Sequence, residues 1–419
     1  MFIYMSNQLK VLFFDWMSEN GAKYDKPEDY IYYFIQFLNS NGLQINRVSL
    51  GGAALHPEIE AFGFTFTDEI IGESTVPFTD PLMVSSIYVN YPKGNILKMR
   101  FRAGIRMGEG FKNSPIPVLW EKKEPIHIPI YKTESNEYPI IEDLRKKGAT
   151  EYYAQPLLLN QGVMSYISLS SNLTSGFNEE TVATLKQILE IFAMGWLRFR
   201  QNEMISSLLS LYLGPMTGPQ VLAGKIRRGD VETKEAVIWF SDIRDYTSIS
   251  SNYPTEEVIQ WLNDYYQEQI SNIHKFGGEV LKIMGDGMLA IFPTDESRNI
   301  KTMARRAVIA YLQSKEFLKN QNLIRKKESK PILAHGIALH HGKVQYGNIG
   351  SQDRLDFTII GSDVNLTSRI SSHCGKYERD LLLSASFAKL VKNHTILIEE
   401  NVNFKGLTKP ENIYSLSSR

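Results

Sequence analysis

The sequence predicts an α+β protein with two domains joined by a long helix. In the first part, residues 1–177, a helix is followed by short alternating segments, which is the order of a helix packed on an antiparallel sheet. A helical stretch at residues 178–213 comes next. The second part, residues 214–419, has the order strand, helix, hairpin, helix, strand, a split βαβ arrangement. We therefore expect three segments with these boundaries.

Composition narrows the classes of function. A chain of 419 residues can form two domains with separate cores. Lys plus Arg and Asp plus Glu both total 46, so no overall charge draws the chain to nucleic acid or to an anionic membrane. Cys374 is the single cysteine, which excludes internal disulfides and thiolate zinc clusters. The apolar run Ile188–Leu197 is shorter than the roughly 20 residues of a membrane span, and the N-terminus lacks a signal-peptide pattern. We expect a cytoplasmic protein.

The first segment combines helices with a sheet. A helix begins at Pro27, and alternating segments follow between Phe62 and Arg102. The later stretch YAQPLLLNQGVMSYISLS, leading into SGFNEETVATLKQIL, resembles the back half of a GAF-type sensor domain. This resemblance implies a GAF-like α/β regulatory domain. Some GAF-like domains hold a small ligand in the cup of the sheet and others only dimerise, and both alternatives stay open.

The stretch from 178 to 213 predicts a signalling helix between the two domains. Its apolar residues recur at intervals of three and four, which is typical of a coiled-coil seam in a parallel dimer. These residues are Val182, Leu185, Leu189, Phe192, Trp196 and Phe199. The alternative is that the stripe packs on the sheet of its own domain.

Two aspartates stand at the ends of apolar strands in the third segment. Asp242 follows the run Ala236–Phe240, and Asp286 occupies the Gly-Asp-Gly tip of a hairpin within Val280–Phe292. A carboxylate at a strand end avoids the desolvation cost of the interior. Aspartates in turns often bond only to their own backbone, which is the structural alternative. Two such carboxylates side by side would require a cation.

A third block follows, HGIALHHGKVQYGNIGSQDRLDFTIIGSDVNLTSR, from His335 to Arg369. The three blocks, in this order, resemble the catalytic domain of class III nucleotidyl cyclases over roughly residues 211–415. The resemblance implies a ferredoxin-like core. It also implies that Asp242 and Asp286, with the backbone carbonyl of Ile243, bind two Mg²⁺ or Mn²⁺ ions.

The third block also predicts a short helix with two polar residues on one face. Ser362 and Asp363 offer a helix cap, and in the helix that follows Asn365 and Arg369 are separated by four residues. By the resemblance, Asn365 positions the ribose and Arg369 stabilises the pentacoordinate α-phosphate. A surface salt bridge is the alternative role for Arg369.

Base and phosphate recognition are inferred from single positions. Lys282 stands where similar adenylyl cyclases carry lysine and guanylyl cyclases glutamate, and Thr358 stands where one bacterial subgroup carries threonine. An ammonium group donates to the unprotonated N1 of adenine, which favours adenine. Lys405 matches a lysine that binds the triphosphate in some members. Asp245 and Tyr246 depart from the usual Gly and Phe of the family.

Together these features predict an adenylate cyclase that converts ATP to 3′,5′-cyclic AMP and pyrophosphate by two-metal catalysis. The resemblance implies a homodimer in which each active site takes residues from both chains. The N-terminal domain would regulate it, with a small molecule as a candidate regulator. A guanylate or mixed-specificity cyclase is one alternative, and a catalytically silent nucleotide-binding signalling module is another.

Overall fold

The computed structural model describes residues 2–68, 82–132, 138–159, 163–406 and 409–417. The chain divides into two compact units, Met1–Leu208 and Leu209–Arg419. The division falls inside helix α6, Glu179–Leu213, which is continuous over the stretch predicted to be helical. None of the described helices is both long and apolar enough to cross a membrane.

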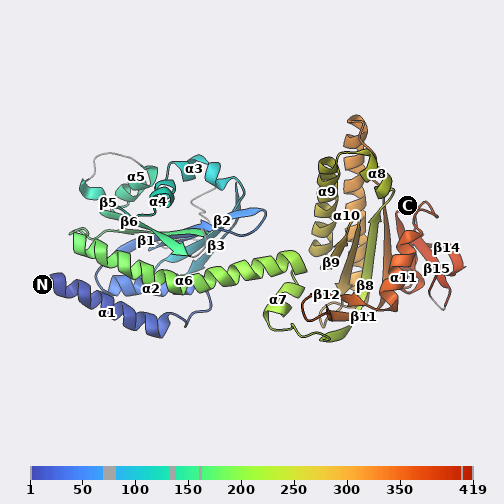
Figure 1. Cartoon of the computed structure of the whole chain (residues 1–419), viewed down its shortest axis with the longest axis horizontal. Coiled ribbons are helices and arrows are strands. Elements are labelled where there is room, and N and C mark those ends of the chain that lie inside the picture. Colours follow the sequence, from blue (N-terminus) through green and yellow to red (C-terminus); the bar gives the residue numbers. More distant parts are fainter. Residues whose placement is uncertain (1, 69–81, 133–137, 160–162, 407–408, 418–419) are drawn as a thin grey trace. The chain divides into compact units, whose positions relative to one another are not determined.

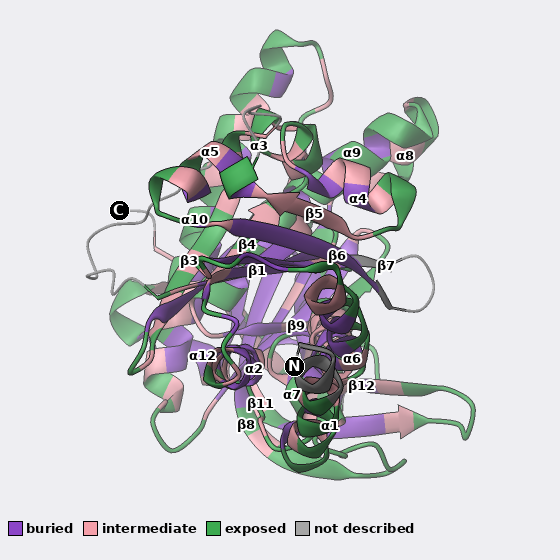
Figure 2. Cartoon of the chain, turned by 90° about the vertical axis from the view of Figure 1, so that its left-hand side faces the viewer, coloured by how far each residue is buried: buried purple, intermediate pink, exposed green. Residues whose placement is uncertain are grey.

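The first unit is built on an antiparallel sheet of seven strands in the order β3-β4-β2-β1-β7-β6-β5. The strands are β1 Ile45–Ala53, β2 Ile59–Thr67, β3 Met83–Asn90, β4 Asn95–Arg102, β5 Ile126–Pro129, β6 Glu151–Leu159 and β7 Val163–Ser171. Alternating segments were expected between Phe62 and Arg102, and the described residues of that range include β2, β3 and β4, whereas residues 69–81 lie outside the described residues. Figure 2 shows β6 buried over most of its length, because helices cover both faces of the sheet.

Helices α1, α2 and α6 cover one face of this sheet, and α3, α4 and α5 lie on the other (Figure 1). Their bounds are α1 Phe2–Asn20, α2 Pro27–Ser40, α3 Glu109–Lys112, α4 Ile116–Lys122 and α5 Pro139–Lys146, with 3₁₀ turns at Ile105–Met107 and Ile130–Lys132. The two helical layers enclose separate apolar clusters, so the sheet is buried on both sides.

The apolar stripe of α6 lies in the core of the first unit. The Tyr30 ring stacks on the Phe192 ring at 4.8 Å, and the Tyr30 hydroxyl donates to the Phe192 carbonyl at 3.1 Å. Five stripe residues are buried members of this core and the sixth packs at its edge; they are Leu185, Leu189, Phe192, Trp196, Phe199 and Val182. The prediction of a coiled-coil seam along this stripe is therefore wrong. Helices α1 and α2 and the sheet already occupy the face that a partner helix would need.

The second unit is a mixed sheet in the order β14-β15-β13-β11-β8-β10-β9, with β12 paired to β11. The strands are β8 Val231–Ile243, β9 Glu279–Met284, β10 Gly287–Pro293, β11 His335–Gly350, β12 Leu355–Ile360, β13 Leu381–Ser384, β14 Thr395–Val402 and β15 Glu411–Leu416. The helices are α7 Thr217–Leu222, α8 Tyr246–Asn252, α9 Thr255–Lys275, α10 Ile300–Lys327, α11 Ser362–Ser372 and α12 Ala385–Ala388, with a 3₁₀ turn at Lys392–His394.

Strand β8 is the central support of the second unit. Val237 and Trp239 face the cluster formed with α9 and α10, whereas Ala236 and Ile238 face the cluster on the opposite side of the sheet. All four side chains are fully buried. This confirms the predicted strand with apolar contacts on both faces. Burial of these side chains on both faces fixes β8 within the sheet, and this fixes the backbone at Asp242 near the end of the strand.

Candidate active site

The two aspartates singled out in the sequence lie next to each other. Strands β8 and β10 pair so that Asp242 faces Gly287, the residue after Asp286. The amide of Ile243 donates to the backbone carbonyl of Asp286 at 3.2 Å. A Cβ on Gly287 would lie 3.7 Å from Asp242 Oδ1, which shows how closely the carboxylate approaches the hairpin. The strand end and the hairpin tip therefore form one site.

The hairpin tip is held by a helix behind it. β9 and β10 are joined through Gly285 and Asp286, and Gly285 has a φ of 69°, a conformation that glycine adopts without strain. The hydroxyl of the buried Tyr266, on α9, donates to the Gly285 carbonyl at 2.7 Å. The predicted hairpin is confirmed, and this contact fixes the backbone beside Asp286.

The electrostatics of the aspartate pair favour a cation. Partial desolvation, and then the neighbouring Asp286 carboxylate, raise the pKa of Asp242 to about 6. Two carboxylates in this arrangement repel each other when both are ionised, and a divalent ion between them removes the repulsion. The donors here are all oxygens, namely two carboxylates with the Ile243 carbonyl nearby, which suits Mg²⁺ or Mn²⁺. The residues therefore fit the predicted metals.

Helix α11 presents the next two candidate residues to solvent. Asn365 and Arg369 are both exposed on one face, while Thr367 and Ile370 are buried on the other. In the part of the chain that the structure describes, neither the Asn365 amide group nor the Arg369 guanidinium has a hydrogen-bond or ion-pair partner. The surface salt bridge considered for Arg369 is absent from these described residues, and both groups are free to meet a substrate.

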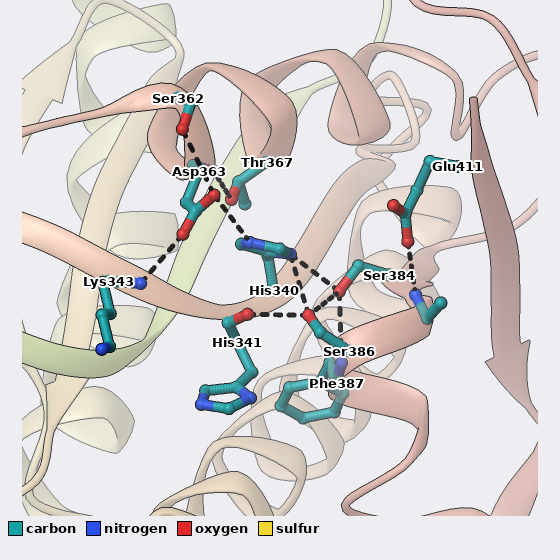
Figure 3. Close-up of polar contacts among 11 residues, drawn as sticks. His340, His341, Lys343, Ser362, Asp363, Thr367, Ser384, Ser386, Phe387 and Glu411 are labelled. Carbon is teal, nitrogen blue, oxygen red and sulfur yellow. Dashed lines mark hydrogen bonds and ion pairs between the residues drawn. The ribbon is translucent and has the colours of Figure 1, made fainter. Parts of the chain in front are cut away.

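The start of α11 is tied to the sheet through Asp363 (Figure 3). Its Oδ2 accepts a hydrogen bond from the Lys343 amide of β11 at 2.9 Å, and its Oδ1 lies 3.7 Å from Nε2 of the buried His340. The His340 ring holds the pKa of Asp363 below its usual value. On its other side, His340 Nδ1 lies 2.8 Å from Ser384 Oγ at the end of β13. His340 and Asp363 thus link α11 to two strands.

The sequence contains two adjacent histidines, His340 and His341, but it did not indicate a role for His340. His341 turns the other way, and its Nε2 lies 2.9 Å from Glu235 Oε1. Within the described ranges, no group of three or more His, Cys, Asp or Glu side chains is close enough to hold a metal ion. The two histidines therefore act with separate partners.

Lys282 pairs with an aspartate that sequence reasoning missed, and this aspartate lies on the strand that carries Thr358. The Lys282 ammonium forms an ion pair with Asp356 on β12. Thr358 is two residues further along the same strand, and alternate residues of a strand share a face. The sequence pattern Asp-x-Thr in DFT could have indicated this aspartate, because it places the Asp356 and Thr358 side chains on the same face of β12.

Lys405 is exposed in the segment that follows β14. Its neighbour Phe404 is buried, and the Phe404 ring meets the His373 ring edge to face at 4.8 Å, just after α11. At the other end of the site, Asp245 has a φ of 55°, which explains why a glycine is comfortable at this position. Aspartate also adopts this left-handed conformation, so the departure from the family pattern at Asp245 is accommodated by the local backbone.

The candidate residues form three groups within one chain. The aspartate pair is the first, Lys282 with Thr358 the second, and Asn365 with Arg369 the third. Among the described residues, no side-chain hydrogen bond or ion pair joins the aspartate pair to either of the other groups.

Comparison with known proteins identifies the second unit. Residues 230–418 match the family described as the adenylate and guanylate cyclase catalytic domain. These residues form a class III cyclase catalytic domain. The chain is 29% identical over 192 residues to "Adenylate cyclase, terminal-differentiation specific" of Dictyostelium discoideum, covering 45% of this chain and 9% of the relative. It is 29% identical over 257 residues to "Adenylate cyclase" of Anabaena cylindrica, covering 60% of this chain and 46% of the relative.

Among solved structures, the adenylyl cyclase CyaB from P. aeruginosa is 28% identical, with a TM-score of 0.42, and the match covers 45% of this chain and 97% of that chain. The chain spans less than half the length of each of these two curated relatives.

Proposed function

We propose that the class III cyclase domain at residues 230–418 converts ATP to 3′,5′-cyclic AMP and pyrophosphate in a homodimer. The observation that carries this proposal is the juxtaposition of Asp242 and Asp286 at one strand end of a cyclase catalytic domain. In the reaction, the ribose 3′-oxygen bonds to the α-phosphorus as its proton passes to solvent. The bond from that phosphorus to the bridging oxygen of the β-phosphate breaks, and pyrophosphate leaves.

Asp242 and Asp286, with the Ile243 carbonyl, would hold two Mg²⁺ or Mn²⁺ ions. When bound, these ions lower the pKa of the ribose hydroxyl and neutralise the charge of the triphosphate. The raised pKa of Asp242 supports this assignment, because it arises from partial desolvation and then from the neighbouring Asp286 carboxylate, and a bound cation would offset both.

Asn365 would position the ribose, and Arg369 would stabilise the negative charge that develops around the α-phosphorus. A guanidinium suits this task because it is planar, stays charged and donates to two oxygens at once. The exposed, unpartnered state of both side chains among the described residues supports these roles. Lys405 would contact the terminal phosphates from the segment beside α11.

Lys282 and Thr358 would select the base. The Lys282 ammonium carries three protons, so it can keep its bond to Asp356 and still donate to N1 of adenine. The Thr358 hydroxyl, or the Asp356 carboxylate, can accept from the adenine amino group. The same ammonium and carboxylate can also pair with O6 and the N1 proton of guanine, which keeps the guanylate or mixed-specificity alternative open.

The base assignment predicts a change in nucleotide preference. In Lys282→Glu/Thr358→Cys, we expect ATP turnover to fall at least about tenfold more than GTP turnover, because glutamate accepts the guanine N1 proton and repels the adenine N1 lone pair. Rates of cyclic AMP and cyclic GMP formation measure the change, and Lys326→Glu on the exposed end of α10 is the matched control. Equal losses on both nucleotides would mean that Lys282 and Thr358 do not read the base.

The overall function is tested by incubating the full chain with ATP or GTP and Mn²⁺, and measuring cyclic products by chromatography. Cyclic AMP as the main product supports the proposal. A preference for cyclic GMP would favour the guanylate alternative. Nucleotide binding without either product would identify a silent signalling module.

Because Asp363 links α11 to the sheet, we expect a substitution at Gly342, which is not a candidate site residue, to lower the activity. In Gly342→Ala the new Cβ would lie 2.1 Å from Asp363 Oδ2, so Asp363 and the start of α11 must move. We expect kcat to fall about 10- to 100-fold, the cost of misplacing Asn365 and Arg369 by about 1 Å. Steady-state kinetics measure this.

Two controls make this prediction specific. Gly375→Ala, where a Cβ would meet nothing within 4 Å, should leave kcat unchanged. In an Asp363→Gly background, Gly342→Ala should add little further loss, because the clashing carboxylate is gone and so is the Asp363 Cβ, which lies 2.8 Å from the added Cβ. If the two substitutions are fully additive, the clash with Asp363 is not the cause.

The first unit would regulate the cyclase domain as a GAF-like domain, with a small molecule as a candidate regulator. A helical layer on each face of an antiparallel sheet supports this assignment. Helix α6 leads directly from this unit into the second one and would transmit the signal. The cytoplasmic location stays a prediction.

A further inference from the structure

The second unit contains a large cavity away from the candidate nucleotide residues. Its volume is about 1140 Å³, and it lies between one face of α10 and the segments around residues 378–381, 389–394 and 415–417. None of the eight candidate site residues lines it. The α10 residues that line it recur at intervals of three and four, so they form a single continuous wall.

The cavity is strongly cationic, although the whole chain has no net charge. Two acidic residues, Glu378 and Asp380, face it. Six cationic residues line it, namely Lys301, Arg305, Lys315, Arg379, Lys389 and Lys392. A chain with 46 residues of each sign thus concentrates positive charge in one hollow.

Most of this positive charge is not neutralised by the protein. Lys315 Nζ pairs with Asp380 at 3.0 Å, which uses one cation and one acid. In the described part of the chain, the side chains of Lys301, Arg305 and Lys389 form no ion pair. A concave wall carrying several uncompensated cations attracts an anion.

The wall between the cations is apolar. Ile309 and Leu312 line the cavity and are 41% and 50% exposed. Leu390 and Leu416 extend the apolar surface from the opposite side. A ligand that covered these side chains would gain from removing apolar area from water.

We propose that this cavity binds an amphipathic anion, a molecule with an apolar body and a carboxylate or phosphate group. The cations would hold the acidic group, and Ile309 and Leu312 would pack against the apolar body. A flat membrane surface does not reach the floor of a concave site. A polynucleotide offers no aliphatic group for the leucine and isoleucine side chains. The volume accommodates a ligand of ordinary small-molecule size.

The test uses isothermal titration of the full chain with four probes below their micellar concentrations. Dodecyl phosphate and dodecanoate carry both features, inorganic phosphate carries only the charge, and dodecyl maltoside only the apolar chain. We expect saturable binding of one dodecyl phosphate or one dodecanoate per chain, and the stronger of the two identifies the preferred acidic group. Inorganic phosphate and dodecyl maltoside should bind at least about tenfold more weakly, because each lacks one of the two contacts.

Variants separate this cavity from other sites. Arg305→Glu and Leu312→Ser should each weaken binding of the preferred probe about tenfold or more, through the loss of a charge-assisted contact or of apolar cover. Lys326→Glu, a charge reversal on α10 outside the cavity, and Arg369→Ala, in the candidate nucleotide site, should bind as the unchanged protein does. Unchanged affinity in Arg305→Glu and Leu312→Ser, or inorganic phosphate binding as tightly as dodecyl phosphate, would overturn the proposal.

Discussion

Asp242→Ala protein should retain its fold and produce cyclic AMP at least about a thousandfold more slowly, since a bound metal contributes several kcal/mol to such a transition state. The carboxylate lies at the end of β8 and is exposed, so its removal leaves the buried core of that strand intact. Initial rates with Mn²⁺ and ATP measure the loss. Asp264→Ala, which removes an exposed aspartate from α9, is the matched control and should keep full activity. Comparable rates in the two variants would show that Asp242 is not a metal ligand.

The same carboxylate predicts a pH dependence. Its pKa is raised to about 6, so a proton occupies the aspartate pair below that pH and must leave before a metal binds. The Mn²⁺ concentration for half-maximal activity should therefore rise about tenfold per pH unit as the pH falls below 6, and should be constant above 7. Without metal, the free energy of unfolding should change with pH in the opposite direction. A carboxyl group whose pKa is raised on folding stabilises the fold at low pH, and this contribution is lost as the pH rises through about 6.

Mixing two inactive variants should restore activity. We propose that each active site takes Asp242 and Asp286 from one chain and Lys282, Thr358, Asn365 and Arg369 from the other. Lys282 lies only four residues before Asp286, yet its ammonium pairs with Asp356 on β12, which supports this arrangement. A two-fold dimer then contains two equivalent composite sites. Asp242→Ala and Arg369→Ala proteins would each be inactive alone.

In a mixed dimer of these two variants, both lesions fall in one site and the other site is intact. After random subunit exchange, half of the dimers are mixed, so we expect about a quarter of the unmutated rate. Exchange is verified by native mass spectrometry. Asp242→Ala mixed with Asp286→Ala is the control, because these lesions fall in different sites and should restore nothing. No recovery in the first mixture would place catalysis within a single chain.

The sequence was sufficient to predict the features that depend on residues close together along the chain. The apolar run before Asp242, the Gly-Asp-Gly tip at Asp286 and the four-residue interval from Asn365 to Arg369 predicted a strand, a hairpin and a helix face that the structure contains. These features depend on strand alternation, turn conformation and helix periodicity, which are properties of neighbouring residues.

What only the tertiary structure decided is which partner each surface meets. The apolar stripe on α6 has the spacing of a coiled coil, but a helix packed inside a domain has the same spacing. In the structure, aromatic residues of α1 and α2 pack against this face of α6. Asp356 joins Lys282 across 74 residues of chain, and His340 faces Asp363 from another element. The cationic cavity collects residues from α10 and from three distant segments. Periodicity determines which side chains share a face, whereas the competition among all available surfaces for burial determines what covers that face.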